Sequence, residues 1–339
     1  MKRTSIKDIA EELGISNATV SLVLSGKAKD GRVSFEMAEK IKETAKLMNY
    51  HANGLARGLR MGHSQTLGLI VADISNPFFG SLAFQIQKEA EKFDYTIIIA
   101  NTNESDEKME KIIEILKSRQ VDGFIIVPTE HSETLVDELR ESKTPMVLID
   151  RYFPNIHTSN VVVDNYRASY EATNLLISDG SKRIALVIYN SNMSHIQDRR
   201  NGFIDALNKA QIYDPKLVCK VNYGHIEEDI AKGMDKFMSM EDKPDGIFFT
   251  TNTLSIIGLK EMIKRGIKIQ DDIKIVCFDE NDAFNFDRNP IPYVKQPIEQ
   301  MGSLAVDILV NQITRQDVNV ITSCLSAEII SPVSIYTDS

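Results

Sequence analysis

The chain has 339 residues, 42% of them hydrophobic and 26% charged, with a formal net charge of -9. This length and composition are typical of two or three globular domains. The first residues lack the apolar run of a secretory signal, and no segment approaches the roughly 18 apolar residues of a membrane span. We therefore expect a cytoplasmic protein without a membrane partner. The cysteines, Cys219, Cys277 and Cys324, are far apart among apolar neighbours, which favours small buried side chains over a disulfide or metal site.

The charge is divided unevenly along the chain. Residues 1–63 contain 11 Lys and Arg against 7 Asp and Glu, which leaves 28 against 41 for the remainder. A basic segment on an acidic body is typical of a polyanion-binding head, because phosphate contacts need Lys and Arg. A solvated charged surface would give the same balance, so the charge alone leaves both interpretations open.

Two short helices are predicted at the start of the chain. Ser5 and Asp8 have the spacing of a capping box, apolar residues then recur at helical intervals, and Gly14 ends the pattern. Ser16 begins a second helix that ends near Ser25. The short connection between them is typical of a helix-turn-helix.

A third predicted helix begins at Ser34 and completes a small three-helix core. Its apolar face consists of Phe35, Ala38, Ile41, Ala45 and Met48. In a helix-turn-helix unit the second helix enters the major groove with its first residues at the base edges. We therefore expect Asn17, Ala18 and Leu22 to face outward.

The next segment, residues 49–66, has a weak helical pattern. Leu55, Ala56 and Leu59 lie at helical spacing, but Gly54 and Gly58 each cost about 1 kcal/mol relative to Ala in a helix. Alone, the segment should be mostly unfolded, and ordering on binding would make it a switch. A plain flexible linker fits the same residues.

From Thr66 onward, buried-strand patterns alternate with amphipathic helical ones. The first predicted strands are 67–73, 95–101, 122–128, 145–150 and 160–164, with helices at 79–93, 105–119 and 134–140. A second set follows at 183–189, 216–222, 245–252 and 273–279. The pattern predicts parallel sheet covered by helices on both faces, and it favours two lobes over a single large sheet. Ligands of such sheets bind beyond the carboxyl ends of the strands, where the polar residues are Asp73, Asn76, Asn101, Asp150, Arg151, Asp164, Asn252 and Asp279.

No enzyme signature is present in this body. The sequence has no GxGxxG after a strand, no P-loop, no GxSxG elbow and no His pair at metal spacing. The six histidines, including His195 and His225, are scattered and are predicted to lie at the surface. We expect neither an enzyme nor a bound metal or cofactor.

Five motifs occur together: "IKDIAEELGISNATVSLVLSG", "NYHANGLARGLR", "LGLIVADISNPFF", "RRNGF" and "CFDEN". In this order and spacing they resemble the LacI/GalR family of transcriptional regulators over essentially the whole chain. The resemblance implies a homodimer in which each chain has a three-helix DNA-binding head (1–52), a hinge helix and linker (53–64) and an α/β core (65–339). The core would resemble a periplasmic sugar-binding protein, with two doubly wound parallel sheets. Its first subdomain would comprise about 65–164 and 297–323, and its second about 165–296 and 324–339.

The resemblance assigns DNA contacts to the recognition helix. Asn17, Ala18 and Leu22 occupy its base-reading positions. Phosphate or capping positions are Ser5, Thr19 and Ser21, and Ser16 belongs to the same DNA-binding set. Leu22 departs from the larger polar residue common in the family, and an apolar side chain contacts a thymine methyl but makes no bidentate bond to guanine.

The hinge contributes a second set of DNA contacts by the same resemblance. Leu59 matches a leucine that family members insert into the minor groove, which unstacks a base step and kinks the duplex. Arg57 and Arg60 would lie along the DNA backbone, and Asn53 is a further DNA contact. Gly58 departs from the usual Ser or Gln, so ordering this hinge should cost more.

The resemblance also implies an effector cleft between the lobes. Its members would be Asn76, Phe78, Phe79, Arg199, Tyr223, Asn252 and Asp279. Fork donors, acceptors and an aromatic face suit a hydroxyl-rich molecule such as a sugar. Asp150 and Arg151 also belong to the expected site: Arg151 would suit a sugar acid or phosphate, and an ion pair with Asp150 or across the lobes is the alternative. Thr253 replaces an Asp common in the family.

The implied function is repression of carbohydrate genes on pseudo-palindromic double-stranded operator DNA, gated by a small effector. A coupling of about 1 to 3 kcal/mol between the two sites would suffice. Two alternatives remain at this point, a cytoplasmic solute-binding sensor and a regulator that responds mainly to a protein corepressor.

Overall fold

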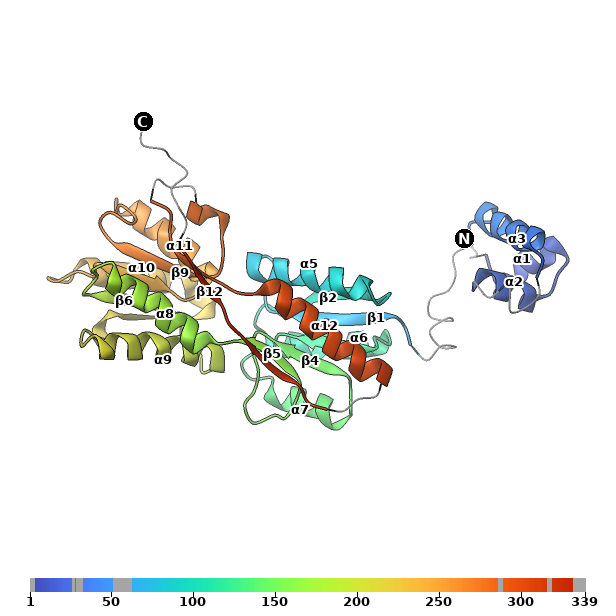
Figure 1. The fold of residues 1–339 in the computed structure, drawn as a ribbon, viewed down its shortest axis with the longest axis horizontal. Coiled ribbons are helices and arrows are strands. Elements are labelled where there is room, and N and C mark those ends of the chain that lie inside the picture. The colour runs from blue at the N-terminus through green and yellow to red at the C-terminus, as the bar shows by residue number, and fades with distance from the viewer. Residues whose placement is uncertain are drawn as a thin grey trace, which may run out of the picture. The chain divides into compact units, whose positions relative to one another are not determined.

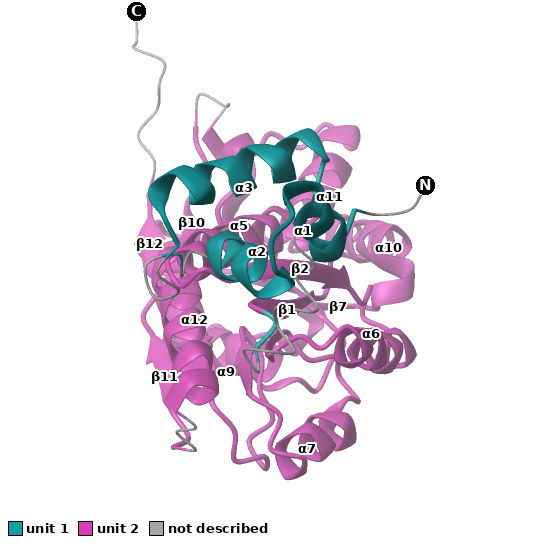
Figure 2. Ribbon diagram, turned by 90° about the vertical axis from the view of Figure 1, so that its right-hand side faces the viewer, with its two compact units in different colours: residues 1–64 teal, residues 65–339 magenta. Residues whose placement is uncertain are grey.

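A computed structural model of the protein describes residues 4–25, 28, 33–50, 63–285, 289–315 and 319–331. The chain divides into two compact units, residues 1–64 and 65–339, which Figure 2 colours separately. Asn53, Arg57, Leu59 and Arg60, the residues predicted for the hinge, lie outside the described residues. No helix in the described part of the chain is long and apolar enough to span a bilayer.

The N-terminal unit is a three-helix bundle of α1 (Ile6–Leu13), α2 (Asn17–Leu24) and α3 (Phe35–Leu47). The predicted capping box is confirmed: the Asp8 amide donates to Ser5 Oγ at 3.3 Å, and the Ser5 amide donates to the Asp8 carboxylate at 2.7 Å. Gly14 ends α1 in the left-handed region at φ 66°, which glycine adopts without steric cost. The helix-turn-helix prediction is therefore confirmed.

The three helices share one small core. It consists of Ile9, Ala10, Val20, Val23, Ala38, Ile41 and Ala45. The prediction for Phe35 is wrong, because its side chain is 83% exposed. Phe35 is the first residue of α3, and helical side chains lean toward the N-terminus, so this ring projects beyond the turn that packs on α1 and α2.

The first lobe of the second unit is a six-stranded sheet in the order β11-β5-β4-β3-β1-β2, with every neighbouring pair parallel. Its strands are β1 (Thr66–Val71), β2 (Thr96–Asn101), β3 (Gly123–Ile126), β4 (Met146–Ile149), β5 (Asn160–Val163) and β11 (Thr322–Leu325). Helices α5 (Pro77–Glu91) and α12 (Ile298–Arg315) pack together on one face (Figure 1). The other face is covered by α6 (Asp106–Ser118) and α7 (Glu133–Glu141).

The second lobe repeats this plan with the order β12-β10-β9-β8-β6-β7. Its strands are β6 (Ile184–Tyr189), β7 (Val218–Val221), β8 (Gly246–Phe249), β9 (Lys274–Phe278), β10 (Tyr293–Lys295) and β12 (Glu328–Ile330). The helices are α8 (Asn165–Ser178), α9 (Ser194–Lys209), α10 (Ile226–Met238) and α11 (Asn252–Lys264), with short 3-10 turns η1 (Pro215–Leu217), η2 (Tyr223–His225) and η3 (Asp282–Asn285). Helix α8 packs beside α9, and α10 beside α11.

Three details depart from the sequence prediction. β12 is antiparallel to β10, because it continues directly from β11 after Ser326 and Ala327 and keeps that strand's direction. Figure 1 shows this ribbon running from one lobe to the other. The expected subdomain boundary at 323/324 falls inside β11, which belongs wholly to the first sheet. Cys219 and Cys277 are buried as expected, whereas Cys324, on the edge strand β11, is exposed.

Both sheets place their ligand-binding edge in the same way. In each, the second strand of the lobe lies outside the first, as β2-β1-β3-β4-β5 and β7-β6-β8-β9-β10. The strand order therefore reverses beside β1 and beside β6, and such a reversal opens a crevice at the carboxyl ends. The loops at these ends supply the walls of the site.

Candidate functional site

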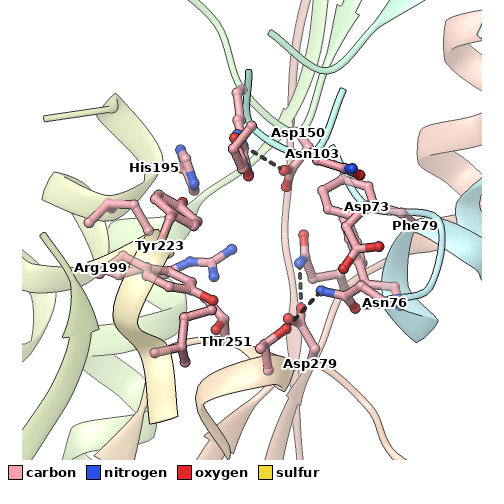
Figure 3. A pocket seen from close by; sticks show the side chains of 18 residues that line it. Asp73, Asn76, Phe79, Asn103, Asp150, His195, Arg199, Tyr223, Thr251 and Asp279 are labelled. Carbon is pink, nitrogen blue, oxygen red and sulfur yellow. Dashed lines mark hydrogen bonds and ion pairs between the residues drawn. The ribbon is translucent and has the colours of Figure 1, made fainter. Parts of the chain in front are cut away.

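A cavity of about 270 Å³ lies between the lobes, at the carboxyl ends of both sheets (Figure 3). The first lobe contributes Asp73, Asn76, Phe78, Phe79, Asn103, Glu104, Asp150 and Arg151. The second lobe and its connection contribute Tyr189, His195, Ile196, Arg199, Tyr223, Ile226, Thr251, Thr253, Asp279 and Gln296. The volume is near the lower end for small-molecule pockets, which suits a single small ligand.

Of the residues predicted for an effector, one does not line the cavity. Asn252 is 3% exposed, and its side-chain amide donates to the Glu280 carbonyl at 3.1 Å and accepts from Asn281 at 3.2 Å. Asn252 is the first residue of α11, and its backbone amide donates to the Asp279 carboxylate at 3.1 Å. Asn252 therefore positions Asp279, and the prediction of a direct contact from its side chain is wrong.

Asp150 and Asp279 occupy equivalent places in the two lobes. They directly follow β4 and β9, and both have left-handed backbones, with φ values of 67° and 73°. Few non-glycine residues adopt this region, although Asp tolerates it, and such outliers cluster at functional sites. Asp279 also accepts a 2.6 Å hydrogen bond from Gln296 Nε2. The two turns present a buried carboxylate to the cavity from each side.

Arg199 projects into the middle of the cavity from α9 (Figure 3). Its Nε donates to Asn165 Oδ1 at 2.8 Å, and its Nη1 donates to the Thr250 carbonyl at 2.7 Å. The guanidinium carbon lies 3.5 Å from the centroid of the Phe278 ring. Burial lowers the pKa of Arg199, and the negative charges of Asp279 and Asp150 oppose that shift.

Arg151 is held within the first lobe by Glu104. Its Nη1 and Nη2 donate to the two Glu104 carboxylate oxygens, each at 2.7 Å, and its Nε lies 3.6 Å from Asp150 Oδ2. Burial opposes the charge of Arg151, but the carboxylate of Glu104 raises its pKa above the ordinary value. Arg151 thus forms an ion pair with Asp150, and its bidentate partner is a residue that the sequence analysis did not single out.

Burial also dominates the chemistry of Asp150. It raises the pKa of this carboxyl to about 6, against the opposing charges of Arg151 and Arg199. The carboxyl is 5% exposed. Asp150 is therefore mostly ionised at pH 7 and gains a proton under mildly acidic conditions.

His195 does not lie at the surface, contrary to the sequence prediction. It is 5% exposed in the first turn of α9, and its Nδ1 has no hydrogen-bond partner among the described residues. Burial, with the charges of Arg151 and Arg199, lowers its pKa well below 6.5, so the imidazole is neutral. One sequence signal could have found it: His195 precedes Arg199 by four residues and shares its helix face.

Aromatic side chains form two walls of the cavity. Tyr189 and Tyr223 stack with centroids 4.1 Å apart and an interplanar angle of 16°. Burial raises the pKa of Tyr189 to about 12. On the first lobe, the rings of Phe78 and Phe79 meet edge to face at 5.0 Å. Of these, Tyr189 was missed, since it ends a strand that reads as a purely buried run.

Hydrogen bonds between described residues join the two lobes. Asn76 Nδ2 donates to Thr253 Oγ1 at 3.4 Å, so the threonine that replaces an Asp of the family pattern contacts the opposite lobe. The Asn192 amide donates to Glu130 Oε1 at 2.7 Å. Ser194 Oγ donates to the Tyr152 carbonyl at 3.4 Å.

The helix-turn-helix presents the start of α2 to solvent. Asn17 and Ala18 are exposed, and Leu22 is half-buried and lies outside the three-helix core. Ser16 caps α2 by accepting from the Thr19 amide at 3.1 Å, and the two hydroxyls lie 2.9 Å apart. Ser21, in the middle of α2, is half-buried.

Comparison with known families accounts for nearly the whole chain. Residues 5–53 match the profile of bacterial regulatory proteins of the lacI family, and residues 64–329 match that of periplasmic binding proteins and the sugar binding domain of the LacI family. The chain belongs to the LacI family. Members of this family are transcriptional regulators rather than enzymes, and they bind operator DNA and small-molecule effectors such as sugars.

Individual LacI-family relatives match along most of their length. The HTH-type transcriptional regulator RegA of Clostridium saccharobutylicum is 29% identical over 96% of this chain and 98% of its own. The ribose operon repressor of Halalkalibacterium halodurans is 31% identical over 92% of this chain and 91% of its own. Among solved structures, the transcription regulator CcpA of Lactococcus lactis superposes with a TM-score of 0.70 at 25% identity, covering 78% of this chain and 97% of that one.

Proposed function

We propose that this LacI-family protein is a homodimeric repressor of carbohydrate genes, and that a small sugar-like effector in the interlobe cavity sets its affinity for operator DNA. The observation that carries this proposal is the set of side chains directed into the cavity. Arg199 offers fixed donors, Asp150 and Asp279 offer acceptors from opposite lobes, and stacked tyrosines offer an apolar wall. This combination suits the hydroxyls and the apolar face of a sugar ring.

We assign the DNA contacts to the head and the hinge. Asn17 and Ala18, at the exposed start of α2, would read base edges, with Leu22 further along the same helix. Ser5, Ser16, Thr19 and Ser21 would approach phosphates in addition to their local roles, and the backbone of a capped helix start suits such anions. Asn53, Arg57, Leu59 and Arg60 would complete the contact set in the minor groove. A DNA regulator of this kind works in the cytoplasm.

Regulation follows if the effector favours one angle between the lobes. Each lobe supplies part of the cavity, so a ligand that contacts both lobes binds best when they are close. The chain passes from one sheet to the other near residues 164, 296 and 326, the last in place of the expected boundary at 323/324, and these three connections would act as the hinge. A change there would alter the dimer face of the core, and the coupling typical of allosteric proteins, about 5- to 150-fold, would be enough for control.

One experiment tests the proposal as a whole. The purified protein is first screened for stabilisation by neutral sugars, uronic acids and sugar phosphates, since a ligand at about 100 times its Kd should add about 2.7 kcal/mol to the unfolding free energy. A duplex selected from a random pool is then titrated with and without the best ligand, at several salt concentrations.

We expect salt-dependent DNA binding that the ligand changes by about 5-fold or more. As a control for the hinge, Leu59→Ala should weaken specific binding far more than unspecific binding. A ligand that stabilises the core yet leaves operator affinity unchanged would refute the gating, and affinity without salt dependence would refute the DNA-binding role.

A further inference from the structure

The charges around the cavity are unbalanced. Its lining residues include four carboxylates, of Asp73, Glu104, Asp150 and Asp279, and two guanidinium groups. A cavity in which negative groups outnumber positive ones repels an anionic ligand, and the repulsion is strongest where water is excluded. The lining thus opposes carboxylated and phosphorylated ligands before any specific contact is considered.

Both guanidinium groups already have hydrogen-bond partners within the protein. Both terminal nitrogens of Arg151 donate hydrogen bonds to the Glu104 carboxylate. An incoming carboxylate or phosphate would need the same planar two-bond geometry. The Arg151 side chain is 6% exposed and that of Glu104 is 20% exposed, so the pair is little screened by water. Arg199 is fixed by Asn165 and Thr250 and faces buried aspartates.

The loop that carries Glu104 has an unusual backbone. Asn103 and Glu104 are consecutive left-handed residues, with φ values of 52° and 59°. Asn tolerates this region, but a glutamate there is uncommon and costs energy. The Asn103 amide donates to the Ala72 carbonyl at 2.8 Å, which anchors the turn to the end of β1. The turn brings the Glu104 carboxylate from the end of β2 to an arginine at the end of β4.

The remaining polar atoms of the cavity suit an uncharged ligand. Among the described residues, Gln296 Oε1, His195 Nδ1 and Arg151 Nε are buried lining atoms without a hydrogen-bond partner. They comprise a neutral acceptor, one nitrogen of a neutral ring and a single N–H. A hydroxyl group both donates and accepts a hydrogen bond, so it can pair with any of these three atoms. An anionic group could pair only with the Arg151 N–H, which lies beside the carboxylates of Asp150 and Glu104.

We propose that Glu104 is the specificity-determining residue of this cavity: by occupying Arg151 it restricts the site to uncharged, hydroxyl-rich ligands and excludes their carboxylated and phosphorylated counterparts. This inference rests on the proposed effector role of the cavity and deepens it. It also answers the question that the sequence left open for Arg151, in favour of the protein's own carboxylate.

The test removes the carboxylate and measures anion binding. Melting temperatures are measured at pH 7.5 and fixed ionic strength for three proteins: wild type, Glu104→Gln and Glu104→Gln/Arg151→Gln. Each protein is tested with inorganic phosphate, with glucose, glucuronate and glucose 6-phosphate, and with ribose and ribose 5-phosphate. Glu110→Gln, an exposed glutamate on α6, is the matched control. Every variant is compared with its own ligand-free melting temperature.

We expect phosphate to bind Glu104→Gln at least about tenfold more tightly than wild type or Glu110→Gln, and the gain to vanish in the double variant. For any neutral sugar that stabilises wild type, the acidic counterparts should bind at least about tenfold more weakly. The proposal is overturned if wild type binds phosphate as tightly as Glu104→Gln, if neither binds it, or if the double variant keeps the gain.

The test still decides the role of Glu104 if the variant does not fold or if no neutral sugar binds. If Glu104→Gln does not fold, Glu104→Asn replaces it, because asparagine tolerates the left-handed backbone of this position and also leaves both terminal nitrogens of Arg151 without a carboxylate, so it should likewise admit phosphate. If no neutral sugar binds wild type, the carbohydrate effector of the proposed function fails, while the phosphate comparison still decides the role of Glu104.

Discussion

The buried carboxyl of Asp150 makes the stability of the core depend on pH. Its carboxyl is buried in a left-handed turn, and burial raises its pKa to about 6 from an ordinary value near 3.8. A carboxyl whose folded pKa is raised binds protons more tightly in the folded state than in the unfolded state. Its contribution to stability is therefore complete below about pH 4 and is lost as the pH rises through 6.

Asp150→Asn should remove this pH dependence. The variant is expected to gain unfolding free energy relative to wild type, from near zero at pH 4 to at most about 3 kcal/mol at pH 7.5. Urea unfolding across that range measures the difference. Asp94→Asn is the matched control, because Asp94 is also left-handed, at φ 60°, but exposed. A gain that is equal at every pH would contradict the assignment of the pKa to burial.

Arg199 should carry the response to the effector. Its hydrogen bonds to Asn165 and Thr250 fix the guanidinium. Arg199→Lys keeps the positive charge but loses the planar set of N–H donors that makes these bonds. We expect Arg199→Ala to abolish stabilisation by the effector, Arg199→Lys to weaken it at least about tenfold, and both to keep ligand-free operator affinity. Calorimetry and DNA titration measure the two properties. Loss of DNA binding along with effector binding would mean that the residue is structural.

At the scale of elements, close helix contacts fix the second lobe. Helix α9 packs against α8 through Gly202, where an added Cβ would lie 2.2 Å from the Tyr166 carbonyl oxygen. That distance leaves no room for a methyl group without moving one helix. The register of α9 places both His195 and Arg199 at the cavity, so this packing also positions the site.

Gly202→Ala should destabilise the core although alanine is the better helix former. We expect a loss of about 1 to 3 kcal/mol or more in unfolding free energy, since overpacking outweighs helix propensity. Gly80→Ala in α5 makes the same change where the nearest atom is 3.6 Å away, and it should instead gain up to about 1 kcal/mol. Denaturant unfolding of both variants gives the signs, and a neutral Gly202→Ala would show that the two helices separate freely.

At the scale of the whole core, the hydrogen bond between Asn192 and Glu130 joins the two lobes. The bond from the Asn192 amide to Glu130 lies outside the cavity lining, so it affects closure without contacting an effector. A ligand that contacts both lobes binds to the closed form. Its apparent affinity is therefore proportional to the fraction of ligand-free molecules that are closed, and weakening closure lowers both.

Glu130→Ala should therefore weaken effector binding by about three- to tenfold. The titration should still saturate at one effector per site. The measurement is calorimetric titration with the stabilising sugar, together with the dissociation rate. Glu133→Ala, an exposed neighbour at the start of α7, is the control and should bind like wild type. Unchanged affinity in Glu130→Ala would show that this contact does not hold the lobes together.

Much of this architecture could be read from local sequence. The capping box of Ser5 and Asp8, the turn at Gly14 and the alternation of apolar strands with amphipathic helices depend on residues near each other in the chain. Strand-end positions also placed Asp150, Arg151 and Asp279 at one edge, because parallel strands bring their carboxyl ends together. The short strands β10 and β12 were missed, since three residues carry no periodicity.

Only the tertiary structure decided which of these side chains meet. The pairing of Glu104 with Arg151 joins loops 47 residues apart through two left-handed turns, and no local pattern encodes it. His195 is buried because α9 packs on α8 through Gly202, and Asn252 is turned away because α11 begins at it. The sequence by itself determined the longer elements and the family, through short-range periodicity and motif order. The charge and specificity of the cleft depend on contacts between distant segments, which exist only once both lobes are folded.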